Sequence, residues 1–192
     1  MINFKNSTFI KSLTDVKEKP SGQLPEVLIV GKSNVGKSSL INALTSHTRL
    51  AFTSSKPGHT KLLNYFNIDN KFYLVDAPGY GYAKGGVDLD RLFGEMMEQY
   101  FVDNHELKLV LLLLDSRREF NQNDLEILSY VQQENIPFYL VVTKVDKVNQ
   151  SEKAKLNKHL KEMNVASDII YYTSSNEPRS LDKLRSAIEK AL

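Results

Sequence analysis

An eight-residue stretch, Gly31-Lys32-Ser33-Asn34-Val35-Gly36-Lys37-Ser38, most narrowly limits how this chain folds. The apolar run Val27–Val30 precedes it, and the helical pattern Ser38–Leu44 follows it. This G-x-x-x-x-G-K-S spacing predicts a strand, a phosphate-binding loop and a helix. Glycines let the backbone turn tightly, so that successive N–H groups and the helix N-terminus face an anion. In such a loop Lys37 reaches nucleotide phosphates, Ser38 ligates Mg²⁺, and Ser39 continues the loop into the helix.

Strand-like runs alternate with helical patterns along the rest of the chain. We expect strands at 26–30, 62–68, 72–75, 109–114, 138–142 and 169–172, and helices at 91–102, 121–133, 151–163 and 180–192, the last two capped by serines. Only three residues, Asp69–Lys71, join the second and third strands, so these two form an antiparallel hairpin. The pattern predicts an α/β fold with a mostly parallel six-stranded sheet, one antiparallel edge strand and helices on both faces.

The length of 192 residues suits a single domain. The segment 17–25 is polar and contains proline and glycine, so we expect an N-terminal extension at 1–22 that packs on a domain at 23–192.

Two further segments suit the triphosphate end of a nucleotide. Asp76-Ala77-Pro78-Gly79 ends the hairpin: Asp76 is placed to hold Mg²⁺ through water, and the Gly79 N–H to sense a γ-phosphate. Thr60 lies between the P-loop helix and the hairpin, where a switch threonine closes on Mg²⁺ and the γ-phosphate. We therefore expect Mg²⁺ to be bound by Ser38, Thr60 and Asp76. The expected nucleotide contacts in this region also include Gly58, His59, Lys61 and Leu62.

Thr143-Lys144-Val145-Asp146 follows the fifth expected strand and points to guanine. A carboxylate at Asp146 accepts hydrogen bonds from guanine N1–H and the 2-amino group, whereas adenine leaves it unpaired. The stem of Lys144 is placed to lie over the base. Thr173, Ser174 and Ser175, after the last strand, are placed to present a backbone N–H to guanine O6.

Together these motifs resemble the Ras-like GTPase superfamily and, more closely, the EngB family of bacterial GTPases. The finer resemblance rests on 31–39, 54–60, Asp115-Ser116-Arg117, 143–146 and above all Asp76-Ala77-Pro78-Gly79-Tyr80-Gly81-Tyr82-Ala83. It spans nearly the whole chain, with His59 where relatives commonly have Lys or Arg. The resemblance implies GTP/GDP binding, a role in assembly of the large ribosomal subunit, and a requirement in cell division and septation.

The residue after Gly79 is Tyr80, where many relatives carry a glutamine that orients the attacking water. We therefore expect slow GTP hydrolysis, with Lys37, Thr60, Gly79 and Asn34 as the candidate catalytic residues. Two sources of activation are open: K⁺ bound by the Asn34 side chain, or a ribosomal partner that orders the switch segments. Two plainer interpretations are equally open, in which Asn34 only forms a turn and Tyr80 is an exposed partner contact.

Composition excludes several other classes of protein. The chain has no cysteine, which excludes disulfides and thiolate metal sites, and 25 basic against 23 acidic residues leave a net charge of only +2. The longest apolar run, Leu109–Leu114, is too short to span a bilayer. We expect a cytoplasmic monomer with no membrane partner. A basic helix face at Lys153, Lys155, Lys158 and Lys161 is either solvated or an RNA contact, and a metabolic P-loop kinase is the competing class of function.

Overall fold

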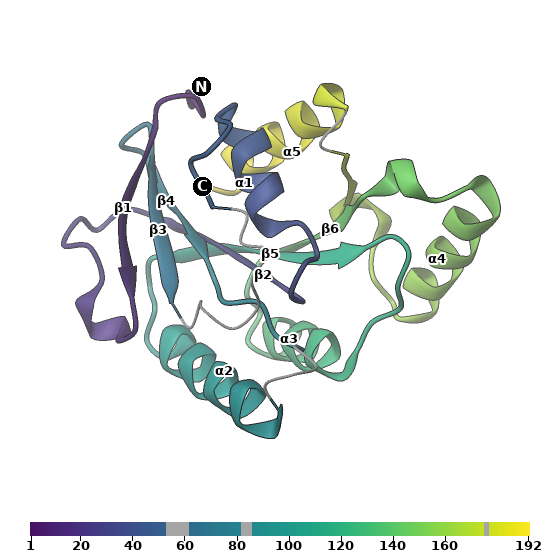
Figure 1. The fold of residues 1–192 in the computed structure, drawn as a ribbon, viewed down its shortest axis with the longest axis horizontal. Coiled ribbons are helices and arrows are strands. Elements are labelled where there is room, and N and C mark those ends of the chain that lie inside the picture. The colour runs from purple at the N-terminus through teal and green to yellow at the C-terminus, as the bar shows by residue number, and fades with distance from the viewer. Residues whose placement is uncertain (53–61, 82–85, 175–176) are drawn as a thin grey trace.

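The computed structural model describes residues 1–52, 62–81, 86–174 and 177–192. Within these ranges a central sheet separates two layers of helices (Figure 1). Helices α1 (Lys37–Thr45) and α5 (Pro178–Ala191) cover one face. Helices α2 (Gly86–Phe101), α3 (Gln122–Gln133) and α4 (Gln150–Glu162) contribute to the core on the other face. The predicted three-layer α/β fold is confirmed.

The described residues form one sheet of seven strands in the order β1-β3-β4-β2-β5-β6-β7. The strands are β1 (Ser7–Leu13), β2 (Glu26–Gly31), β3 (Leu63–Ile68), β4 (Phe72–Asp76), β5 (Leu107–Asp115), β6 (Phe138–Thr143) and β7 (Ile170–Tyr172). Strands β4, β2, β5, β6 and β7 run parallel, and β3 pairs antiparallel with β4, as the short hairpin predicts.

The seventh strand, β1, corrects the predicted count of six. It pairs antiparallel with β3 from Ser7↔Ile68 to Leu13↔Leu63, so β3 lies inside the sheet and β1 forms its edge. The register shifts between Phe9 and Lys11, which breaks the alternation of buried and exposed side chains that identifies a half-buried strand. Sequence periodicity therefore offered no clear strand signal here.

Two apolar clusters, one on each face of the sheet, hold the layers together. The cluster under α1 and α5 includes Leu40, Leu44 and Ile188. The opposite cluster includes Met97 and Tyr100 of α2, with Phe93 and Met96 packed against it. Strand β2 is buried along its whole length because helices cover both of its faces.

Two helix starts differ from the expected serine caps. Helix α4 is capped by Asn149, whose side chain accepts a hydrogen bond from Glu152 N while the Glu152 carboxylate accepts one from Asn149 N. Helix α5 begins at Pro178 with no capping side chain in the part of the chain that the structure describes, and Ser180 lies in its first turn, where its Oγ donates to Glu177 O. Proline suits the first turn because the amide that it lacks has no intrahelical partner there. Helix α2 starts at Gly86, five residues before the predicted start.

Candidate functional site

The predicted motifs lie on one edge of the sheet because each follows the carboxyl end of a parallel strand. Strand β2 ends at Gly31, β4 at Asp76, β5 at Asp115 and β6 at Thr143. Ligands of open α/β sheets bind outside the carboxyl ends of the strands. The candidate site is therefore assembled from segments that are distant in the sequence.

The P-loop has the geometry of an anion cradle. Gly36 precedes α1 with a φ of 113°, a left-handed conformation that side chains disfavour, and no side chain of the described residues caps the helix. The first N–H groups of α1 are thus left for an anion. A Cβ atom on Gly31 would lie 2.8 Å from Val35 Cγ1, so the start of the loop has room only for glycine.

The ammonium group of Lys37 lies beside the switch segment, the name that we give to the residues 76–81 that end β4 and follow it. A Cβ atom on Gly79 would be 3.2 Å from Lys37 Nζ and 2.9 Å from Ser33 Cα, so Gly79 lies directly against the P-loop. Burial lowers the pKa of Lys37, and the negative charge of Asp76 partly offsets that effect. Gly79 and the charge of Asp76 therefore both lie near the Lys37 ammonium, as expected of groups that handle the terminal phosphates.

The carboxyl group of Asp76 fits a magnesium site. It is 8% exposed, and its Oδ1 has no hydrogen-bond partner among the described residues. Burial raises its pKa to about 6, although Lys37 and a hydrogen bond from Asn64 oppose the rise. A buried oxygen without a partner requires an explanation, and Mg²⁺ with its bound waters prefers such oxygen ligands. Ser38 follows Lys37 in the first turn of α1 and carries a hydroxyl group, a second oxygen of the kind that Mg²⁺ prefers.

Tyr80 is not an exposed contact residue, which corrects one of the two interpretations of this position. It is 2% exposed, its ring packs on Phe93 with centroids 5.0 Å apart, and its hydroxyl donates to Asp124 Oδ1. Its carbonyl accepts a 2.9 Å hydrogen bond from Ser33 N. Tyr80 thus ties the switch segment to the P-loop and to α3, and in this conformation it cannot orient a water.

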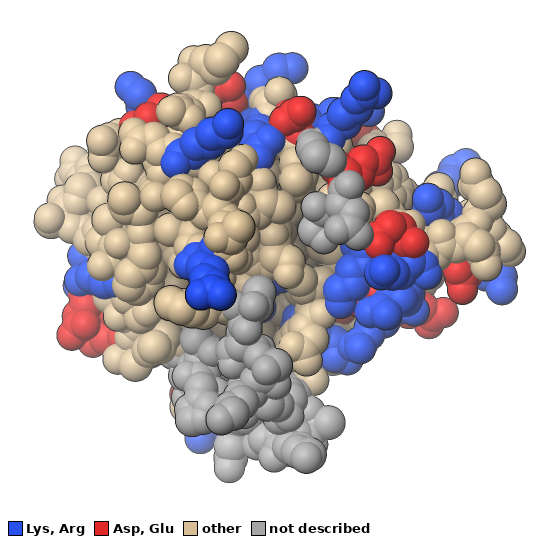
Figure 2. All heavy atoms as spheres, turned by 45° about the horizontal axis from the view of Figure 1, so that its top comes forward, with Lys and Arg blue, Asp and Glu red and all other residues tan. Residues whose placement is uncertain are grey.

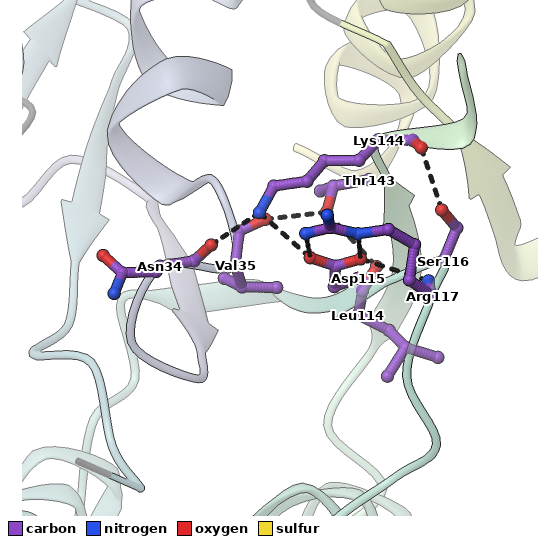
Figure 3. A network of polar contacts seen from close by, with 8 residues as sticks. All are labelled: Asn34, Val35, Leu114, Asp115, Ser116, Arg117, Thr143 and Lys144. Atoms are coloured by element: carbon purple, nitrogen blue, oxygen red, sulfur yellow. Dashed lines mark hydrogen bonds and ion pairs between the residues drawn. The ribbon is translucent and has the colours of Figure 1, made fainter. Parts of the chain in front are cut away.

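The loop after β6 is attached directly to the P-loop, as Figure 3 shows. Thr143 Oγ1 donates to Val35 O at 2.7 Å, and Lys144 Nζ donates to Asn34 O at 2.7 Å. Lys144 has a φ of 58° and Asn34 a φ of 63°, both left-handed. These bonds fix the spacing between the phosphate end and the base end of the site.

Asp146 is held by the loop after β7. Ser174 Oγ donates to Asp146 Oδ1 at 2.9 Å, and this hydrogen bond lowers the pKa of Asp146. The chain around Ser174 is fixed in turn, because Thr173 is buried and its N–H donates to Val142 O at 2.7 Å. Asp146 is thus an ionised, oriented and exposed acceptor beside Lys144.

The structure brings most of the predicted site residues together. Ala77 N donates to Ile29 O at 2.9 Å, which ties Asp76-Ala77-Pro78-Gly79 to the strand that leads into the P-loop. The P-loop contains Lys32, Ser33 and Ser38, and Ser39 lies in the first turn of α1. Elsewhere in the chain, Val145 is buried and Leu62 immediately precedes β3. Gly58, His59, Thr60, Lys61 and Ser175 lie outside the described residues, as do Tyr82 and Ala83 at the end of the family-specific segment.

Two acidic residues of this region were missed as site residues. Asp115 accepts hydrogen bonds from Lys144 and Arg117, and Asp124 accepts one from Tyr80. The sequence could have indicated Asp115, because it ends the expected strand that precedes the strand leading into Thr143. Asp124 carried none, because only the folded chain brings it to a residue 44 positions away.

Within the described ranges, no helix is both long enough and apolar enough to cross a bilayer.

Comparisons with known proteins agree with this geometry. The family described as 50S ribosome-binding GTPase matches residues 26–144. A probable GTP-binding protein EngB from Prosthecochloris aestuarii is 39% identical over 184 residues, which cover 96% of each chain. A crystal structure of a probable GTP-binding protein engB has a TM-score of 0.71 at 21% identity, covering 86% of this chain and 97% of the other.

Another solved structure shows a bound state of a similar fold. It is Era in complex with MgGDPNP and nucleotides 1506–1542 of 16S ribosomal RNA, with a TM-score of 0.66 and 27% identity. The match covers 88% of this chain and 57% of Era. The P-loop, the guanine-type loop and full-length similarity at about 40% identity lead to one conclusion: this chain belongs to the EngB family of GTP-binding proteins and is a P-loop GTPase.

Proposed function

We propose that this GTPase is a nucleotide-dependent switch in assembly of the large ribosomal subunit. One observation supports the proposed switch: Gly79 and Tyr80 lie against Ser33 of the P-loop. A γ-phosphate in the P-loop would therefore contact the same segment that is bonded to α3 through Tyr80. The family description, 50S ribosome-binding GTPase, supports the ribosomal partner. Era, which is bound to both a GTP analogue and ribosomal RNA, supports the pairing of nucleotide and RNA binding.

The base is guanine because of the chemistry of Asp146. Its carboxylate, held ionised by Ser174, accepts from N1–H and the 2-amino group of guanine. Adenine has an acceptor at N1 and no 2-amino group, so it would leave the carboxylate unpaired. Lys144 supplies one wall for the base, and the segment Thr173–Ser175 supplies a backbone donor to O6.

Mg²⁺ would be held by Ser38 and Asp76, with Thr60 as the ligand that closes in the GTP state. The ion neutralises charge on the β- and γ-phosphates when it is bound. The chain's own contribution is to cradle the phosphates with the P-loop N–H groups and to place the Lys37 ammonium beside Gly79.

Hydrolysis is slow without help, since Tyr80 is buried and bonded to Asp124. Activation comes from K⁺ at Asn34 or from the ribosomal partner. The left-handed conformation of Asn34 already accounts for asparagine at this position, so the ribosome is the source that we favour. Equal turnover in KCl and NaCl at matched ionic strength would exclude the cation.

Basic charge near the site is local. Arg117 and Lys147 are 47% and 60% exposed at the base end, and Figure 2 shows a compact group of Lys and Arg side chains beside acidic ones on one face. Such a surface suits contact with RNA at a defined place. The proposal also includes that the protein is a cytoplasmic monomer without a membrane partner and that it is needed for normal cell division and septation.

The test is co-sedimentation with purified large ribosomal subunits. The protein is loaded with GDP or with a non-hydrolysable GTP analogue, and Asp146→Ala serves as a control that cannot hold guanine. We expect stronger binding in the GTP-analogue state and none of this difference in the control. Equal binding to the ribosomal subunit in the GDP and GTP-analogue states would overturn the proposed switch. A separate competition experiment tests the preference for guanine, since ATP should fail to displace labelled GDP.

A further inference from the structure

Asp115 is a buried, heavily hydrogen-bonded carboxylate of the site and has no place among the nucleotide contacts above. It ends β5, opposite Thr143 of β6, and is 4% exposed. Its Oδ2 accepts from Lys144 Nζ at 2.9 Å and from Arg117 Nη2 at 2.7 Å. Its Oδ1 accepts from Arg117 Nε at 2.9 Å and from Arg117 N at 3.1 Å.

The Lys144 side chain is therefore fixed at both ends. Its backbone is left-handed, and its ammonium lies between the Asn34 carbonyl and the Asp115 carboxylate (Figure 3). A free lysine side chain samples many rotamers, and ordering it on binding reduces affinity. With both ends held, the stem is already ordered before a base arrives.

Arg117 holds the carboxylate in turn. Its guanidinium meets both oxygens of Asp115 in a paired geometry that fixes their orientation. Burial opposes ionisation, but the hydrogen bonds from Arg117 and Lys144 outweigh it and keep the pKa of Asp115 well below its usual range. Because both cations meet at Oδ2, removal of the negative charge would leave them facing each other without a counter-ion.

We infer that Asp115 is a positioning residue for guanine: it holds Lys144 in place as a preformed wall of the base site, and Arg117 orients Asp115. The inference rests on the proposed assignment of Lys144 and Asp146 to the base. The side-chain oxygens of Asp115 are engaged by Arg117 and Lys144, and we assign Asp115 no direct contact with the nucleotide. Its effect on affinity must then pass through Lys144.

That route is testable with a double-mutant cycle on GDP affinity. Labelled GDP is titrated into the wild type, Asp115→Asn, Lys144→Ala and the double variant. We expect Asp115→Asn to weaken binding about tenfold, as for loss of a charged hydrogen bond, and the double variant to bind no more weakly than Lys144→Ala. Fully additive losses would show that Asp115 does not act through Lys144 and would overturn the inference.

Controls separate this result from misfolding and from a wrong site. Asp182→Asn removes an exposed carboxylate paired with Arg185 and should leave GDP affinity unchanged. Arg117→Ala, at a half-exposed position, should weaken GDP binding by a smaller factor of about three even if Asp115→Asn does not fold, because the carboxylate keeps Lys144 but loses its orientation. Unchanged affinity in Arg117→Ala would count against the inference.

Two further variants distinguish a wrong assignment of the base site from a wrong inference about Asp115. If Lys144→Ala and Asp146→Ala both bind GDP like the wild type, the assignment of the base site is wrong and the inference falls with it. If both weaken binding while Asp115→Asn does not, the site stands and only the inference is overturned.

Discussion

The hydroxyl group of Tyr80 donates a hydrogen bond to the carboxylate of Asp124, and both residues are buried. Asp124 also accepts from Asn121 N at 2.8 Å, so the same carboxylate closes the capping box of α3. Burial and the nearby Asp124 charge raise the pKa of Tyr80 far above its usual range, which keeps the hydroxyl a donor. The switch segment and the start of α3 thus share one buried polar contact.

Tyr80→Phe removes this donor and should destabilise the protein. The Asp124 carboxylate then keeps its bond to Asn121 N but loses a second donor in a buried place, which costs about 1.5–3 kcal/mol for a charged acceptor. Urea denaturation without nucleotide measures this loss. Tyr139→Phe is a matched control, since its hydroxyl only meets the Ala187 carbonyl at 3.3 Å and should cost less. Equal losses in the two variants would contradict the special role of the Tyr80 contact.

Gly79→Ala should separate nucleotide binding from hydrolysis. A methyl group here would lie 2.9 Å from Ser33 Cα and 3.2 Å from Lys37 Nζ, so the segment must move away from the P-loop. We expect GDP affinity close to that of the wild type, and single-turnover GTP hydrolysis slower by about a hundredfold, as misplacement near the reacting groups predicts.

Gly94→Ala is the control for this glycine substitution. Gly94 lies on the exposed side of α2, and an added methyl group would point into open space, so alanine should stabilise the helix by about 0.5–1 kcal/mol without slowing hydrolysis. A Gly79→Ala protein that hydrolyses GTP at the wild-type rate would show that this segment does not act in the reaction.

The sequence motifs predicted which segments form most of the candidate site, but not the side-chain contacts that join those segments. The P-loop and the loop after β6 were predictable because a local motif and its strand context fix them together, as at Lys37 and Asp146. Strand β1 was missed because its register shift at Phe9 breaks the alternation of buried and exposed side chains, and because its partner residues in β3 lie 50 to 61 positions away, from Leu13↔Leu63 to Ser7↔Ile68. The Tyr80–Asp124 and Asp115–Lys144 contacts were also missed, since both depend on side chains that approach only after the sheet forms.

Asp76→Asn should remove the Mg²⁺ dependence of nucleotide binding without destabilising the protein. The Asp76 carboxyl is buried, one of its oxygens has no hydrogen-bond partner among the described residues, and its pKa is raised to about 6, so a neutral amide removes a desolvation penalty. We expect unfolding in the absence of nucleotide and metal to be unchanged or shifted to higher denaturant. Chelation of Mg²⁺ with EDTA should weaken GTP-analogue binding by the wild type and leave the variant unaffected. A variant that still responds to chelation would show that another group dominates Mg²⁺ binding.

Phe4→Ala should test whether the N-terminal segment is part of the folded core. Phe4 is 5% exposed, its ring meets Phe72 at 5.8 Å, and the Arg185 guanidinium lies 6.0 Å from the ring centroid. Loss of a buried phenylalanine costs about 3–5 kcal/mol. Phe9 lies in the same segment but is 50% exposed, so Phe9→Ala should cost much less. Thermal denaturation compares the two, and equal small losses would mean that residues 1–22 do not pack on the domain in solution.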